Sequence, residues 1–153
     1  MSIEVMYARR PERTSQVDRP RSRVTEFGRW TRQSGAQRTI ALLTRPGLQP
    51  AVAIAHWRDG LAAGLILIFA DHEPVVRSAI EAARGASSRR FDAGAMQSAA
   101  GDHVLRVWSR DHTIGIGKTS SSGAHLGKAT ILDSAEIDAL ELALDALRQA
   151  AAR

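Results

Sequence analysis

Two stretches of the chain carry the same order of predicted elements, a series of strands followed by one amphipathic helix. The stretch from Asp102 to Gln149 shows this order most clearly, and the stretch from Thr39 to Arg84 repeats it. One further strand precedes each stretch. We therefore predict an α+β fold of tandem β4α repeats, in which two antiparallel sheets are each followed by an amphipathic helix. The repeats would span residues 24–85 and 89–153 of one domain, 24–153.

The strand predictions depend on alternation and on turn residues. In "AVAIAHW" (51–57), Val52 and Ile54 alternate with alanines, and "RDG" then turns the chain. The next segment, "LAAGLILIF" (61–69), is apolar on both parities, which indicates a strand buried on both faces. In the second repeat, Phe91, Ala93 and Ala95 share one parity, and "HLGKATIL" (125–132) reads as a last strand.

Both helices are predicted from capping residues and apolar stripes. Asp71 is the expected N-cap of the first, with Glu73 and Pro74 in its first turn. Asp133 is the expected N-cap of the second, with Glu136 three residues on as in a capping box. The apolar stripes are Val76, Ile80 and Ala83 in the first helix, and Ile137, Leu140, Leu144 and Leu147 in the second.

Composition excludes several classes of protein. The chain has no cysteine, so disulfides, thiolate metal sites and cysteine nucleophiles are impossible, which suits a reducing compartment. No apolar run reaches the length of a membrane span, and the first residues lack the apolar core of a secretory signal. We expect a cytoplasmic protein without a membrane partner.

The charge balance suggests a polyanionic partner. The net charge is +5, and only Lys118 and Lys128 of the 21 basic residues are lysines. Clustered cations bind phosphates by releasing counterions, although an arginine-rich surface can also exist without a partner. Residues 1–23 are rich in arginine and proline and show no periodicity, which predicts a disordered basic tail. The tail is either an additional phosphate contact or a solvated extension.

No motif in the chain supports catalysis. "GIGKT" (115–119) would need a glycine at position 112 to be a phosphate-binding loop, and His112 stands there. None of the five histidines has metal-site spacing, and no nucleophile elbow occurs. We therefore predict a protein that is not an enzyme and that has no metal and no cofactor. The alternative is an enzyme whose site is assembled from the scattered histidines.

The strongest candidate for a binding surface is "HVLRVWSR" (103–110). Side chains alternate faces along a strand, so Leu105 and Val107 point one way while Arg106, Trp108 and Arg110 point the other. Cations that follow the backbone and an aromatic ring that stacks on a base are what a single-strand binder needs. The alternative is an ordinary exposed strand whose charges only prevent it from pairing with other chains.

Other cations and one more tryptophan could extend this surface. In the first repeat, Trp30 and Arg32 share a parity, and Arg58 shares a face with His56. The full predicted nucleic-acid-binding set is Arg106, Trp108, Arg110, Lys118, Lys128, Trp30, Arg32 and Arg58.

The doubled β4α order resembles the Whirly-type single-stranded DNA-binding fold over roughly residues 24–150. The second repeat alone is similar to the C-terminal domain of the positive-cofactor-four transcription coactivators. The resemblance is carried by "LRVWSRDHTIGIG" (105–117), a polar loop, and "GKATIL" (127–132) leading into the acidic helix. Residues 126–132 partly match the lysine–glycine–lysine–alanine–alanine–leucine motif of Whirly proteins, with Leu126 in place of the first lysine and Thr130–Ile131 departing from its end.

The resemblance implies a homo-oligomer whose exposed sheet faces bind single-stranded DNA, with Lys128 as the motif lysine for DNA contact or assembly. Together with the residues, it leads us to expect a non-enzymatic protein that binds single-stranded DNA or RNA. The alternative is a protein–protein interaction or self-assembly module without a nucleic-acid role. In that case "LAAGLILIF" (61–69) and the stripe of Ala139, Leu142 and Ala146 would form the contact.

Overall fold

The computed structural model describes residues 22–85, 89–101, 104–119 and 127–152. Most of the predicted basic tail, the middle of the link between the repeats and the predicted connector Ser120–Gly123 lie outside the described residues. Within the described residues, no helix is long and apolar enough to cross a membrane.

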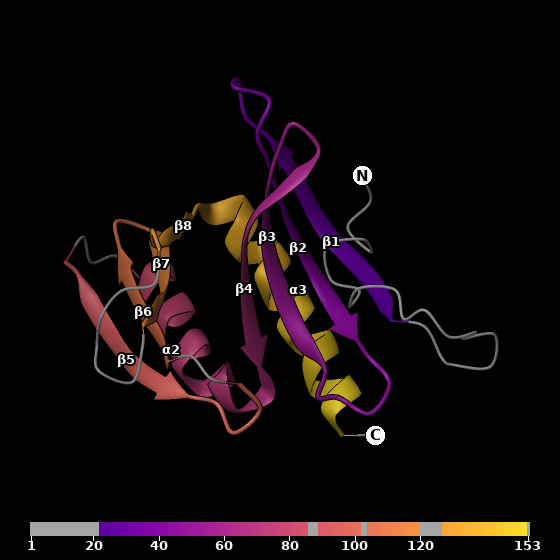
Figure 1. The fold of residues 1–153 in the computed structure, drawn as a ribbon. Helices are drawn as coiled ribbons and strands as arrows, with labels where there is room; N and C mark the ends of the chain where they lie inside the picture. The colour runs from indigo at the N-terminus through magenta and orange to yellow at the C-terminus, as the bar shows by residue number, and fades with distance from the viewer. Residues whose placement is uncertain (1–21, 86–88, 102–103, 120–126, 153) are drawn as a thin grey trace, which may run out of the picture.

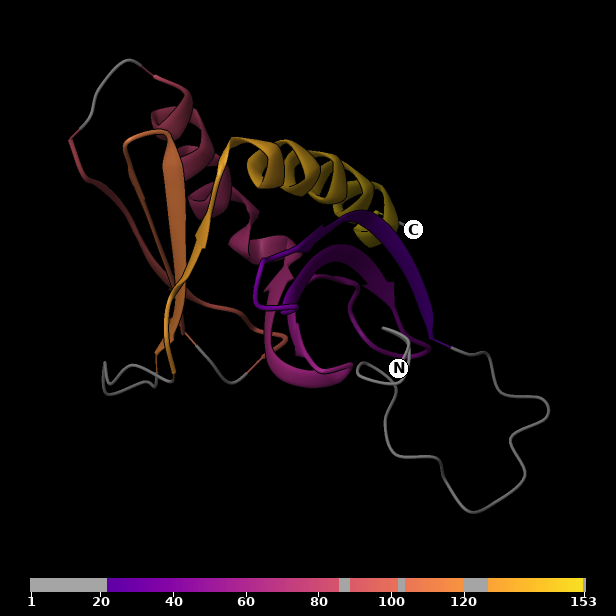
Figure 2. The same ribbon diagram turned by 90° about the horizontal axis from the view of Figure 1, so that it is seen from above.

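The first repeat forms an antiparallel sheet in the order β1-β2-β3-β4, which we call the first sheet. The doubly apolar segment predicted as a strand is β4. From Leu65 to Ile68 its two sides enter two different apolar clusters, whereas residues 61–63 are exposed, so the predicted burial on both faces is wrong for the start of the strand. The sheet is strongly curled (Figure 2). The elements are β1 (Arg23–Thr31), β2 (Gln37–Thr44), β3 (Ala51–Arg58), β4 (Leu61–Phe69), a 3₁₀ turn η1 (Ala70–His72) and α2 (Glu73–Arg84).

The second repeat has the same order, which confirms the predicted α+β arrangement of two antiparallel sheets, each followed by a helix. Its strands form the second sheet in the order β5-β6-β7-β8 (Figure 1). The elements are β5 (Phe91–Gln97), β6 (Val104–Arg110), β7 (Thr113–Thr119), β8 (Thr130–Leu132) and α3 (Ser134–Ala151).

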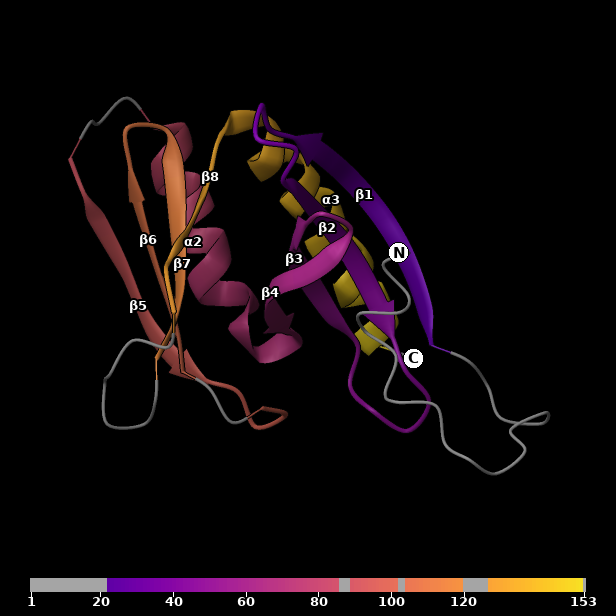
Figure 3. The same ribbon diagram turned by 45° about the horizontal axis from the view of Figure 1, so that its top comes forward.

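Each helix covers the sheet of the other repeat. The helix α2 leaves the first sheet and packs against β5, β6 and β7, whereas α3 leaves the second sheet and packs against β1, β2 and β3 (Figures 1 and 3). One apolar core therefore contains residues from both sheets and both helices. The predicted apolar stripes of both helices lie in this core, as their periodicity indicated.

Charged residues join the two helices across their contact. Arg77 of α2 pairs with Asp145 of α3 at 2.7 Å, and Arg84 pairs with Asp138 at 2.8 Å and with Glu141. These pairs are largely exposed, so each contributes at most about 1 kcal/mol. These pairs connect two helices that belong to different repeats.

A buried ion pair joins the first sheet to the start of α3. Arg38 of β2 donates from Nη1 to Glu136 Oε2 at 2.6 Å, and the same nitrogen donates to the carbonyl oxygen of Ile131 at 2.8 Å. Glu136 also accepts from the backbone N–H of Asp133, which completes the predicted capping box. Arg38 is therefore a cross-repeat anchor for the start of α3.

Three further local predictions were wrong. Asp71 is not the N-cap of α2, because η1 precedes that helix and His72 occupies the N-cap position. Asp71 instead accepts a hydrogen bond from the backbone N–H of Ala99 at 2.9 Å. The last strand is limited to Thr130–Leu132, and Gly127, with φ +88, lies before it in a conformation that favours glycine.

The third of these wrong predictions concerns the parity of β5. The register shifts between Asp92 and Gly94, so a bulge interrupts the strand at Ala93. Ala93 packs against the core, whereas Ala95 pairs with Arg106 on the opposite face. Simple alternation fails here because one extra residue reverses the side of everything after it.

Candidate functional site

The side of the second sheet turned away from α2, which we call the outer face, carries the predicted basic–aromatic row. Along β6, Leu105, Val107 and Ser109 are buried. The alternate residues Arg106 and Trp108 are partly exposed, and Arg110 is exposed. The predicted division of β6 into a buried apolar side and an accessible basic–aromatic side is confirmed.

The indole of Trp108 lies across two glycines of the neighbouring strand. Trp108 and Gly115 are cross-strand partners. A Cβ at Gly115 would lie 2.1 Å from Cε2 of Trp108, and one at Gly117 would lie 3.6 Å from its Cζ3. Only a residue without a side chain fits at position 115 while the ring is there. The "GIG" pattern thus forms a flat seat for an aromatic ring.

Arg90 lies against the same indole. Its guanidinium carbon is 5.3 Å from the ring centroid, a cation–π distance. Since the glycines of β7 back the ring, Arg90 occupies the side that a ligand would approach. In the sequence, Arg90 lies in the link between the repeats, where no pattern indicates a role for it. Only the tertiary structure brings it to Trp108.

An acidic residue also lies on this basic face. Asp92 of β5 is the cross-strand partner of Trp108, and its Oδ2 accepts from Nη1 of Arg106 at 2.9 Å. Its Oδ1 accepts from the backbone N–H of Gly94 at 3.0 Å, across the bulge. Arg110 lies 3.6 Å from the carboxylate of Asp111. The arginines of the outer face are therefore partly neutralised by neighbouring carboxylates.

The β8 side of the outer face is less polar. Ile131 pairs with Gly115 and is 47% exposed, and Ala129 borders Gly117. Lys128 precedes Ala129 and is exposed. The structure thus brings Arg106, Trp108 and Arg110 together on β6, with Lys128 ahead of β8.

The remaining predicted residues lie elsewhere. Lys118 points to the helix-covered side of β7, and its Nζ donates to the carbonyl oxygen of Leu65 on β4 at 2.8 Å, which links the two sheets. Trp30 packs against the core, over Gly28. Arg32 follows β1 and Arg58 ends β3, both exposed and both on the first sheet.

The side of the first sheet turned away from α3 is apolar rather than basic. It carries a buried apolar cluster of Ala41, Leu43, Ala53, Ala55 and Trp57. The indole N–H of Trp57 donates to Oγ1 of Thr39 at 3.0 Å, so this ring is held within the fold. Of the two sheets, the second therefore has the more polar and accessible aromatic surface among the described residues.

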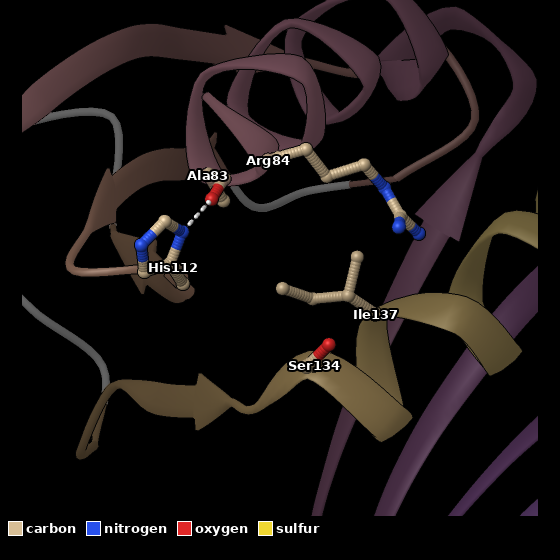
Figure 4. A pocket seen from close by; sticks show the side chains of 5 residues that line it. All are labelled: Ala83, Arg84, His112, Ser134 and Ile137. Carbon is tan, nitrogen blue, oxygen red and sulfur yellow. Dashed lines mark hydrogen bonds between the residues drawn. The ribbon is translucent and has the colours of Figure 1, made fainter. Parts of the chain in front are cut away.

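A pocket of about 280 Å³ lies where the β6–β7 turn meets the end of α2 and the start of α3, lined by Ala83, Arg84, His112, Ser134 and Ile137 (Figure 4). His112 donates from Nδ1 to the carbonyl oxygen of Ala83 at 2.9 Å. Arg84 is paired with acidic residues of α3. The fold itself thus engages two of the polar groups that line this pocket.

The β6–β7 turn carries backbone strain beside that pocket. Asp111 and His112 have φ values of +51° and +65°, and the corresponding β3–β4 turn holds Asp59 and Gly60 at +53° and +75°. A histidine is less favourable than glycine in this region. The hydrogen bond from His112 to α2 offsets part of that cost.

The titratable groups with clearly lowered pKa values lie away from the outer face. Burial, followed by the charges of Arg38 and Arg32, lowers the pKa of His56 from 6.5 to about 4. Its Nε2 is hydrogen-bonded to Oγ1 of Thr130 at 2.9 Å. Burial also lowers the pKa of His72, whose Nδ1 accepts from the backbone N–H of Phe69. Among the described residues, no group of acidic residues and histidines has the arrangement of a metal site.

Comparison of the chain with protein-family models, with curated proteins and with solved structures finds no match.

Proposed function

We propose that the protein is a non-enzymatic, cytoplasmic binder of single-stranded nucleic acid and that it uses the outer face of the second sheet. The observation that carries the proposal is the indole of Trp108, seated on Gly115 and flanked along β6 by Arg106 and Arg110. The Whirly-type resemblance of the sequence implies the same activity. We assign phosphate contacts to Arg106, Arg110 and Lys128, and base stacking to Trp108.

In this proposal a base stacks on the accessible side of Trp108, in the place taken by the Arg90 guanidinium. Stacking of one base on an aromatic side chain contributes about 1–3 kcal/mol. The displaced Arg90 becomes available to a neighbouring phosphate. Because Gly115 holds the ring flat before binding, little conformational freedom is lost when the base arrives.

The geometry favours single strands over duplexes. The bases of a duplex are stacked on one another and cannot reach a ring that lies flat on a sheet, whereas an unpaired strand can turn a base outward. Duplex DNA would then meet the arginines alone, through phosphates. The affinity for a duplex is expected to be lower and to depend mainly on salt.

The test is a fluorescence-anisotropy titration with labelled mixed-sequence single-stranded DNA, RNA and duplex DNA of equal length. We expect binding at low salt that weakens steeply as salt rises. Trp108→Ala should weaken single-strand binding about ten-fold, and Trp108→Phe should weaken it less. Arg106→Ala should also weaken binding. Its matched control is Arg29→Ala, because Arg29 is an arginine of the first sheet that likewise pairs with a carboxylate and has the same 40% side-chain exposure. Absence of binding at low salt, or equal binding by wild type and Trp108→Ala, would overturn the proposal.

The second candidate function is assembly through α3. Of the stripe considered from the sequence, Ala139 is 6% exposed and lies in the core, whereas Leu142 is 58% exposed. A contact through this helix would therefore centre on Leu142. If the chain is a homo-oligomer through α3, Leu142→Glu should reduce the mass measured by light scattering, while Leu48→Glu, on an exposed turn, should not.

A further inference from the structure

We propose that Asp92 determines which base is bound at Trp108, favouring bases with an exocyclic amino group over thymine and uracil. This inference rests on the proposed function and concerns the same site. It starts from one observation that phosphate binding alone does not explain. A carboxylate lies in the middle of a basic face, beside the residue assigned to stacking.

The position of Asp92 suits contact with the edge of a base. Asp92 and Trp108 are cross-strand partners, and such partners have Cβ atoms about 4.5–5.5 Å apart on the same face. The indole leans toward β7, over Gly115 and Gly117. A base stacked on that ring therefore has one edge toward β5, where the carboxylate lies.

The carboxylate is held in place and still has capacity for a ligand. Its Oδ1 accepts from the N–H of Gly94, and its Oδ2 accepts from Arg106. An ionised carboxylate has about four acceptor positions, so these two bonds leave others open. The side chain is 47% exposed, which allows a ligand to reach them.

The chemistry of the base edges gives the direction of the preference. A carboxylate only accepts hydrogen bonds, and the amino group of cytosine, adenine or guanine donates one. Uracil and thymine present a carbonyl oxygen where cytosine has its amino group. Their one donor on this edge, N3–H, lies between the O4 and O2 carbonyl oxygens, which repel a carboxylate that approaches it. Two acceptors then face each other, and one of them loses its partner on binding. Asp92 therefore selects against uracil and thymine as well as for an amino group.

Another role for Asp92 would give a different result. If the carboxylate only orients Arg106 or weakens the positive field, its removal changes the affinity for every single strand by the same factor. Base selection instead changes the ratio between two strands. The ratio is therefore the quantity that separates these roles.

The experiment compares oligodeoxycytidine with oligodeoxyuridine of about 12 nucleotides, a length within the site sizes of single-strand binders. The two bases have the same ring size. They differ at the 4-substituent, which Asp92 would contact, and at N3, which carries a proton only in uracil. Each strand is titrated against the full-length wild type, Asp92→Asn and Asp111→Asn. The amide of Asp92→Asn can offer either a donor or an acceptor, so it should accommodate both bases. Asp111→Asn is the matched control, because it removes a carboxylate near Arg110.

We expect wild type and Asp111→Asn to bind the cytidine strand about five- to ten-fold more tightly than the uridine strand. In Asp92→Asn this ratio should fall to within about two-fold. Equal wild-type affinities, or an unchanged ratio in Asp92→Asn, would overturn the inference while leaving single-strand binding intact. If neither strand nor mixed-sequence DNA binds at low salt, the proposed function itself fails.

Discussion

The ring of Trp108 occupies the space that any side chain at position 115 would need. The nearest ring atom is 2.1 Å from where a Cβ at Gly115 would lie, well inside van der Waals contact. The position of the indole on the outer face therefore depends on the absence of a side chain in the neighbouring strand.

This dependence predicts the effect of a single methyl group. Gly115→Ala should push the indole off β7, weaken single-strand binding about ten-fold and cost about 1–3 kcal/mol of stability. Gly117→Ala is the control, because its Cβ would make an ordinary contact of 3.6 Å with the ring. Anisotropy titrations and urea unfolding measure the two effects. Equal behaviour of the two variants would contradict the described ring position.

The buried pair of Arg38 and Glu136 predicts a large loss of stability when one partner is removed. Glu136→Gln leaves the guanidinium, 8% exposed, without its anion, and should cost about 3 kcal/mol in urea unfolding. Glu26→Gln breaks the exposed pair with Arg29 and should cost less than about 1 kcal/mol. A smaller loss in Glu136→Gln than in Glu26→Gln would contradict the assigned role of the buried pair.

The lowered pKa of His56 predicts that acid destabilises the fold. The unfolded chain takes up a proton near pH 6.5, whereas folded His56 resists protonation until about pH 4. Its contribution is complete above pH 6.5 and is lost as the pH falls toward 4, by about 1–2 kcal/mol after allowance for solvent screening. Urea midpoints measured across this range should fall less steeply in His56→Gln. The same slope in both proteins would assign the pH dependence to other groups, such as His72.

Each helix covers the sheet of the other repeat, an arrangement we call the exchange of helices. It predicts that neither half of the chain folds stably without the other. Residues 1–88 lack α3, which covers the first sheet, and residues 89–153 lack α2, which covers the second. Each fragment alone should fail to unfold cooperatively, and an equimolar mixture should form a folded one-to-one complex. Circular dichroism and light scattering test this. A stable, cooperative, monomeric fragment would show that one repeat can cover its own sheet.

The element order and the burial of the helix stripes could be predicted because they depend on local periodicity. Val76 and Ile80, or Leu140 and Leu144, face a core whichever sheet supplies it. Periodicity does not say which sheet that is. The assignment of α2 to the second sheet depends on the tertiary packing, so the exchange could not be predicted.

The candidate site could be predicted only along one strand. Alternation placed Arg106 and Trp108 on one face because β6 is regular. Alternation did not indicate Arg90, which reaches Trp108 from outside the strands, or Asp92, whose neighbours are set by the bulge after it. Lys118 was predicted to lie on the binding surface, but its side chain is used inside the fold. Its hydrogen bond to Leu65 depends on how the two sheets pack together, which the sequence pattern does not show.

The exchange of helices also links distant parts of the chain thermodynamically. A ligand bound to the outer face, as proposed, would stabilise β6 and β7, which pack against α2 of the first repeat. Ligand binding to the second sheet would therefore also raise the free energy of unfolding of the first sheet. In hydrogen–deuterium exchange, a bound strand should slow the amides of β2 and β3 that exchange only through global unfolding, although the ligand never touches them.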